Sequence, residues 1–212
     1  MNPLLTVFTS SIGKKLLMAV TGFCFCGFLV VHLIGNLTVY GGSETFSAYV
    51  EHLHSLGVLI NVAELGLVLL ALVHVTTGTV LFYQNWRSRP VRYAVRKSSG
   101  GRTIGSATMP YTGFFILVFL VIHLIGFRLE VNSGRSVYEI MTGAFTSPLT
   151  VAVYVMAVLV VAIHISHGFW SLFQTVGFNH AKYSPLIARA GLAFAAVVAA
   201  GFGLIPVYLI MI

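Results

Sequence analysis

Charge is scarce in this chain. Asp, Glu, Lys and Arg make up 8% of its 212 residues, whereas hydrophobic residues make up 58%, and the mean hydropathy is +0.94. About a quarter of the residues of an ordinary soluble domain are charged. So small a charged fraction excludes a soluble globular protein of this size and predicts that the lipid bilayer is the solvent.

Cysteine is also rare, and the chain has no Cys-x-x-Cys-His motif. Covalently attached c-type haem is therefore not indicated. Cys24 and Cys26 lie two residues apart on one expected helix, so their side chains point in different directions and cannot form a disulfide. The long apolar runs show no polar alternation, which favours helices over a membrane β-barrel.

Five apolar runs are each long enough to span a bilayer, which takes about 20 residues of helix. We therefore predict an all-α, integral membrane bundle of five transmembrane helices, with residues 1–212 forming a single domain. Residues 43–55 are expected to form an outer loop, and the second outer loop is expected to hold a short helix near 136–141. The predicted spans are about 14–39, 56–85, 107–129, 148–176 and 186–212.

The basic residues indicate the orientation of the chain in the membrane rather than a nucleic-acid partner. If the chain crosses the membrane five times, ten of its twelve Lys and Arg residues lie on one side, where no acidic residue occurs. All five glutamates lie on the other side, with Arg128 and Arg135. The positive-inside rule therefore puts the N-terminus in the cytoplasm and the C-terminus outside, in the inner (cytoplasmic) membrane. The ten residues are Lys14, Lys15, Arg87, Arg89, Arg92, Arg96, Lys97, Arg102, Lys182 and Arg189.

Histidines recur in matched positions. His32-Leu-Ile-Gly in the first run recurs as His123-Leu-Ile-Gly in the third, and His74 and His164 each have a glycine four residues later. Ionisable side chains inside a bilayer are costly and usually functional. A single one could merely bond a neighbouring helix, but four in four successive helices indicate a duplicated pair of helices that each carry a ligand.

Depth predicts how these histidines pair. At about 1.5 Å of rise per residue, His32 and His123 lie at one level near the outer side, whereas His74 and His164 lie together in the inner half. Two imidazoles at equal depth suit a bis-histidine haem held between the first four helices. Two histidines without a nearby carboxylate or thiolate underfill a zinc or copper site.

Glycines accompany the four histidines. Three or four residues beyond a histidine, a glycine shares its helix face and leaves room for a porphyrin. The alternative is that glycine serves ordinary packing between membrane helices. The glycines are Gly35, Gly78, Gly126 and Gly168.

Three further residues are candidates with open alternatives. His167 lies one turn beyond His164 and competes with it as a ligand, or contacts a haem propionate or a quinone; the repeat spacing favours His164. Glu64 is expected near the outer haem, either as the acceptor of a quinol proton or as a charge that is solvated or paired with a neighbour. Arg128 is a candidate partner of an outer haem propionate or an ordinary loop charge.

At these residues the chain resembles the five-helix dihaem cytochrome b subunit of succinate dehydrogenases and fumarate reductases. The motifs are Ser10-Ser11-x-Gly13-Lys14-Lys15, His32-Leu-Ile-Gly-Asn-Leu, His74-x-x-x-Gly78 with Asn85-Trp-Arg-Ser-Arg-Pro-Val-Arg-Tyr93, and His164-x-x-His-Gly-Phe-Trp-Ser-Leu-Phe-Gln-Thr-Val-Gly177.

The resemblance implies two haem b groups and two partner subunits on the cytoplasmic face, a flavoprotein with FAD and an iron–sulfur protein. It also implies a quinone, usually menaquinone, that reacts near the outer haem. The chain would anchor the complex and pass electrons between the quinone and the iron–sulfur subunit, in either direction, with a dimer of complexes left open. Two alternatives remain: a haem b anchor of another quinone-linked dehydrogenase or hydrogenase, and a structural anchor or transporter with hydrogen-bonding histidines.

Overall fold

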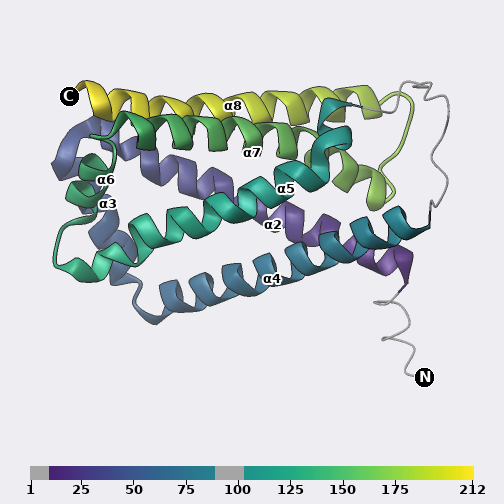
Figure 1. The fold of residues 1–212 in the computed structure, drawn as a ribbon, viewed down its shortest axis with the longest axis horizontal. Helices are drawn as coiled ribbons and strands as arrows, with labels where there is room; N and C mark the ends of the chain where they lie inside the picture. The colour runs from purple at the N-terminus through teal and green to yellow at the C-terminus, as the bar shows by residue number, and fades with distance from the viewer. Residues whose placement is uncertain (1–9, 89–102) are drawn as a thin grey trace.

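The computed structural model describes residues 10–88 and 103–212 and contains five long helices (Figure 1). Each is long and apolar enough to cross a membrane, and the described residues contain no β-strand. The predicted all-α architecture of a multi-pass membrane protein is therefore confirmed. The five are α2 (Ser11–Leu37), α4 (Val58–Arg87), α5 (Ile104–His123), α7 (Pro148–Thr175) and α8 (Ser184–Met211).

Side-chain caps determine where three of these helices begin. The Ser10 hydroxyl accepts a hydrogen bond from the Gly13 backbone N–H at 3.0 Å, at the start of α2. Thr103 forms a capping box with Ser106 before α5, and Ser147 caps α7 ahead of a proline at its first position. Such caps satisfy backbone N–H groups that have no partner within the helix. The caps of α2 and α5 therefore start these helices three residues before the predicted spans.

The prediction that residues 43–55 form an outer loop is wrong. They form helix α3 (Gly42–Ser55), which follows a short 3₁₀ turn, η1 (Thr38–Gly41). Gly42 and Gly57 have φ angles of +84° and +56° and turn the chain at the two ends of α3, a backbone conformation that glycine adopts without steric cost. The segment is polar on average, but it buries Phe46, so one apolar face was enough to fold it.

A short helix in the second outer segment is confirmed. This helix, α6 (Val137–Ala144), lies beside α3 at the end of the bundle where α8 finishes (Figure 1). The two short helices and the end of α8 share a buried cluster, so the chain closes the outer end of its own bundle. The cluster consists of Val39, Phe46, Met141, Phe145, Ile205 and Leu209.

Helix α7 is central to the bundle and α4 is peripheral. α7 packs along α8, α5 and α2, whereas α4 packs mainly on α2, and Figure 1 shows α4 along one edge of the bundle and α8 along the other. Among the described residues of α4, Thr77 is the buried side chain. The interior face of α4 therefore contacts few side chains of the other described helices.

α2 begins at one end of the bundle and α8 ends at the opposite end, as an odd number of crossings requires (Figure 1). The arginine-rich inner loop that the sequence predicts as a docking surface lies mostly at residues 89–102, outside the described residues.

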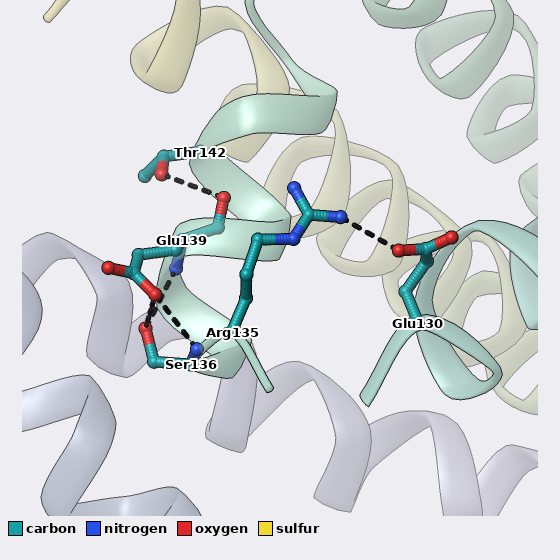
Figure 2. A network of polar contacts seen from close by, with 5 residues as sticks. All are labelled: Glu130, Arg135, Ser136, Glu139 and Thr142. Carbon is teal, nitrogen blue, oxygen red and sulfur yellow. Dashed lines mark hydrogen bonds and ion pairs between the residues drawn. The ribbon is translucent and has the colours of Figure 1, made fainter. Parts of the chain in front are cut away.

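Polar contacts organise the entrance to α6 (Figure 2). Arg135 donates to the Glu130 carboxylate at 2.7 Å, and the Ser136 backbone N–H donates to the Glu139 carboxylate at 2.9 Å. The Glu139 backbone N–H donates in turn to the Ser136 hydroxyl at 3.2 Å, which completes a capping box. Hydrogen bonds from Ser136, backbone and side chain, hold the pKa of Glu139 below its ordinary value of 4.5.

The cap makes the stability of α6 depend on pH. Because the pKa of Glu139 is lowered in the fold, its contribution is complete above the ordinary value of 4.5 and is lost as the pH falls through the lowered pKa. Amide hydrogen-exchange protection of α6 should therefore decrease in that acid range. In Glu139→Gln, whose amide still caps but does not titrate, this decrease should be absent; the same decrease in both proteins would contradict the assignment.

Candidate functional site

The structure brings the predicted outer pair together. His32 on α2 and His123 on α5 have ring centroids 6.0 Å apart, with ring planes at 86°. Both side chains are half-buried. His32 and His123 occupy the same place in two copies of the His-Leu-Ile-Gly segment, 91 residues apart in sequence. The fold therefore brings the histidines of the two copies side by side.

Aromatic rings surround this outer pair. Phe28 stacks on the His32 ring at a centroid distance of 5.1 Å, and Phe119 lies 5.8 Å from the His123 ring. These walls offer few polar partners. The rings within 6.0 Å of the two histidines also include those of Phe127, Tyr154 and Phe202.

The outer histidines are poorly satisfied. The buried Nδ1 atom of His123 has no hydrogen-bond partner among the described residues. The Nδ1 atom of His32 lies 3.4 Å from the amide nitrogen of Asn36, which donates a shorter bond of 2.8 Å to the His32 carbonyl. Buried polar atoms are nearly always bonded, so an orphaned ring nitrogen marks a place where a ligand or another group is needed.

The inner histidines, in contrast, each have a threonine. The Nδ1 atom of His74 lies 2.8 Å from the Thr21 hydroxyl oxygen on α2. The Nδ1 atom of His164 lies 3.0 Å from the Thr112 hydroxyl oxygen on α5. In both halves of the chain, the helix that precedes the inner histidine therefore supplies its partner.

The predicted pairing of His74 with His164 stays a prediction. The backbones of α4 and α7 hardly touch, and each of the two rings bonds a threonine on the neighbouring helix.

The surroundings of the two inner histidines are equivalent. A methyl group built at Gly22 would lie 3.7 Å from Cε1 of His74, and one built at Gly113 would lie 3.5 Å from Cε1 of His164. Either would be in van der Waals contact with the ring. Each inner histidine therefore packs against a Thr-Gly pair on the neighbouring helix.

This Thr-Gly pair is a functional candidate that our sequence prediction missed. Met18-x-x-Thr-Gly-Phe recurs 91 residues later as Met109-x-x-Thr-Gly-Phe, the same interval that separates His32 from His123. Aligned over 18–35 and 109–126, eleven of the eighteen residues are identical. Extending the repeat backwards from the histidines would have found the threonines.

Among the four glycines that accompany the histidines, the packing of the chain requires the small size of Gly35, because a methyl group there would overlap the Tyr49 ring. At the other three, a methyl group would be in ordinary van der Waals contact, so packing does not account for their small size, and a role in making room for a porphyrin stays a prediction. The side chains nearest to a methyl group built at each glycine are Tyr49 at Gly35, Met18 at Gly78, Tyr154 at Gly126 and Met109 at Gly168.

His167 has a different environment from His164. Its buried Nδ1 atom has no hydrogen-bond partner within the described ranges, and its ring lies 5.9 Å from the Trp170 ring. Its Cβ atom packs so tightly against Gly105, at the start of α5, that a methyl group there would lie 2.8 Å away. His167 therefore sits at a close helix contact without a hydroxyl partner.

Glu64 forms an ion pair with Arg128. The guanidinium donates through Nε to one carboxylate oxygen at 2.8 Å and through a second nitrogen to the other at 2.9 Å. Arg128 ends a π-helical turn, η2 (Leu124–Arg128), that follows His123 directly. The pairing with a neighbour that the sequence left open for Glu64 is thus confirmed, while its role as a proton acceptor stays a prediction.

A cavity of about 400 Å³ adjoins this ion pair. It lies beside the start of α4 and the turn η2, and His54 and Asn61 line it with polar side chains. It is therefore a polar recess at the end of α4 where the chain enters from α3.

The described part of the chain contains no group of three or more His, Cys, Asp or Glu residues placed to hold a metal ion. Cys24 and Cys26 are free thiols, as predicted.

Comparison of the chain with protein-family models, with curated protein sequences and with solved structures found no match. The fold and the site together define a helical protein with five membrane-length helices, four of which carry histidines, and two of these histidines, His32 and His123, lie side by side.

Proposed function

We propose that the chain is the dihaem cytochrome b subunit of a quinone-linked succinate dehydrogenase or fumarate reductase. Its histidines hold two haem b groups, and when bound these groups supply one-electron redox chemistry across the membrane. The chain anchors the complex and passes electrons between menaquinone, or another quinone, and an iron–sulfur subunit. The observation that carries the proposal is the His32–His123 ring pair, 6.0 Å apart between two helices, together with the equivalent threonine contacts of His74 and His164.

The outer pair fits a bis-histidine site. His32 and His123, whose ring centroids are 6.0 Å apart, would hold the iron of the outer haem between them. The aromatic wall would exclude water from a bound porphyrin.

The inner histidines suit metal binding because their hydrogen bonds favour the tautomer with the proton on Nδ1. The Thr21 hydroxyl donates to the Leu17 carbonyl at 2.7 Å, so its oxygen accepts from Nδ1–H of His74. Nε2 of that ring then keeps its lone pair for a metal. The same reasoning applies to His164 and Thr112.

His164 is favoured over His167 as the inner ligand. His164 has the threonine partner that the repeat requires. His167 packs against the start of α5 and has no such partner. In this proposal His167 contacts a haem propionate or a quinone.

The quinone reacts at the recess beside Glu64, near the outer haem. The recess combines an anchored carboxylate, the Arg128 guanidinium and polar side chains at the membrane edge. Glu64 accepts a proton from quinol as the electrons leave. Arg128 orients the Glu64 carboxylate. In this proposal that role takes the place of the contact between Arg128 and a haem propionate that the sequence suggested.

The dicarboxylate chemistry takes place on a partner flavoprotein that carries FAD. The flavoprotein and the iron–sulfur subunit dock on the cytoplasmic face, where the basic residues gather. This face is next to the inner haem, so electrons pass between the iron–sulfur subunit and the inner pair first. This arrangement also allows two such complexes to associate as a dimer.

Each histidine pair should be required for one haem. His74→Ala or His164→Ala should lower the haem b content of the purified chain from two to one per chain, because a haem that loses one of two protein ligands is no longer held low-spin and is released. His167→Ala, on the same helix as His164, is the matched control and should keep both haems. Loss of a haem in His167→Ala but not in His164→Ala would reverse the ligand assignment.

The complex purified through this chain should contain a flavin-bearing subunit and should transfer electrons between succinate or fumarate and a quinone. Glu64→Gln should reduce quinol oxidation about 10²-fold or more, as loss of a general base does, and should leave both haems bound. Unchanged quinol oxidation would remove the proton-acceptor role. Co-purification with a different dehydrogenase or a hydrogenase would favour the alternative partner.

The excess of Lys and Arg on one side supports an N-terminus in the cytoplasm and a C-terminus outside, in the inner membrane. Alkaline phosphatase fused after Ile212 should therefore be active in cells, because it folds only outside the cytoplasm. The same enzyme fused after Ser88, at the inner end of α4, is the control and should be inactive. The opposite pattern would invert the topology.

A further inference from the structure

We infer that Thr21 and Thr112 are positioning residues for the inner metal ligands, and that their hydroxyls set the electron-donor strength of His74 and His164. The inference rests on the proposed function, since it concerns how this chain presents its inner histidines to a haem iron. It assigns a role to two residues outside the ligand set itself.

Hydrogen-bond donors determine the direction of these contacts. The Thr112 hydroxyl lies 3.1 Å from the carbonyls of Thr108 and Met109 on its own helix. Its single proton is directed to these carbonyls, so its oxygen accepts the proton on Nδ1 of His164. Thr21 bonds its own helix in the same way, through the carbonyls of Leu17 and Met18.

Burial makes both contacts persistent. Thr21 is 4% exposed and Thr112 is 7% exposed, so neither lipid nor water competes for the hydroxyl. A hydrogen bond in so apolar a region is stronger than one in water. Each ring is therefore held in one orientation and one tautomer.

The contact occurs twice, independently, in the two halves of the chain. In each half, the residue after the threonine is a glycine on which the histidine ring packs, and a methionine three residues before the threonine lies against the glycine that follows the histidine by four. We call each set of Met, Thr and Gly an inner socket: Met18, Thr21 and Gly22 in the first half, and Met109, Thr112 and Gly113 in the second.

The outer histidines and His167 have no such socket. The Nδ1 atoms of His123 and His167 are unpartnered among the described residues, and the Nδ1 atom of His32 lies 3.4 Å from the side-chain amide of Asn36 rather than beside a hydroxyl. The chain thus distinguishes its inner ligands from its other membrane histidines by a hydroxyl acceptor.

The hydrogen bond to the threonine hydroxyl should affect the midpoint potential of the inner haem. A partner that accepts from the second ring nitrogen makes an imidazole a stronger donor to its metal. A stronger donor stabilises the ferric over the ferrous state. Removing the hydroxyl should therefore raise the midpoint potential of the inner haem, whereas a hydroxyl that only bonds its own helix would leave that potential unchanged.

The experiment compares Thr21→Val and Thr112→Val with Thr76→Val in the purified complex. Valine keeps the shape of threonine and removes the hydroxyl. Thr76 is the matched control, because it lies two residues from His74 but is exposed and bonds the backbone of its own helix at Leu72 and Val73. A redox titration measures both haems, and the inner haem is the component lost in His74→Ala.

Each of the two socket variants should weaken the preference of the inner haem for the ferric state about tenfold, which corresponds to an upward shift of about 59 mV for a one-electron couple. The low-spin ferric signal of that haem in electron paramagnetic resonance should also change, because the ring is free to rotate. Thr76→Val should change neither. Thr21→Ser and Thr112→Ser, which retain the hydroxyl, should restore both values.

Two haems with unshifted potentials and signals in both valine variants would overturn the inference and leave the proposed function intact. If the valine variants do not fold, Thr→Cys takes their place, since a thiol is a weak acceptor; equal potentials in the serine and cysteine variants would overturn it as well. A wild-type chain that binds no haem would instead overturn the proposed function.

Discussion

A membrane interior supplies no water to a polar side chain, so every nitrogen of a buried histidine must be engaged by the chain or by a ligand. The two levels of this bundle meet that constraint differently. The inner histidines bind threonine hydroxyls through Nδ1, which leaves Nε2 for a metal. At the outer level, the Nδ1 atom of His123 has no partner in the described chain. The positions of the helices, the aromatic walls and the sockets all follow from placing four such rings in an apolar region.

Duplication explains most of this arrangement. The first hairpin, α2 and α4, and the second, α5 and α7, carry the same inner socket, and their histidines are 42 and 41 residues apart. The symmetry ends after α5, where the π-helical turn η2 takes Arg128 to Glu64. It also ends at α8, which covers α7 while α4 remains peripheral. The first of these departures forms part of the wall of the polar recess beside Glu64.

The sequence predicted the five long helices because local hydropathy can be counted along the chain. It also predicted that His32 and His123 lie together, since helices of known direction and rise place residues at a depth; the pairing of His74 with His164 stays a prediction. Helix α3 was missed because its polar composition concealed one apolar face around Phe46. The pairing of Glu64 with Arg128 could not be predicted, since it depends on a π turn that shifts the helix register. Thr21 and Thr112 were missed for another reason: we searched for metal ligands, and a partner of a ligand has no signature of its own apart from the repeat.

The central claim is that two pairs of histidines hold two iron centres. The most direct test is an anomalous-scattering map at the iron absorption edge, from crystals of the purified complex. The account predicts one iron peak between His32 and His123 and a second between His74 and His164, both distinct from those of the iron–sulfur subunit. No iron peak within the five helices, or a peak at His167 in place of His164, would contradict it.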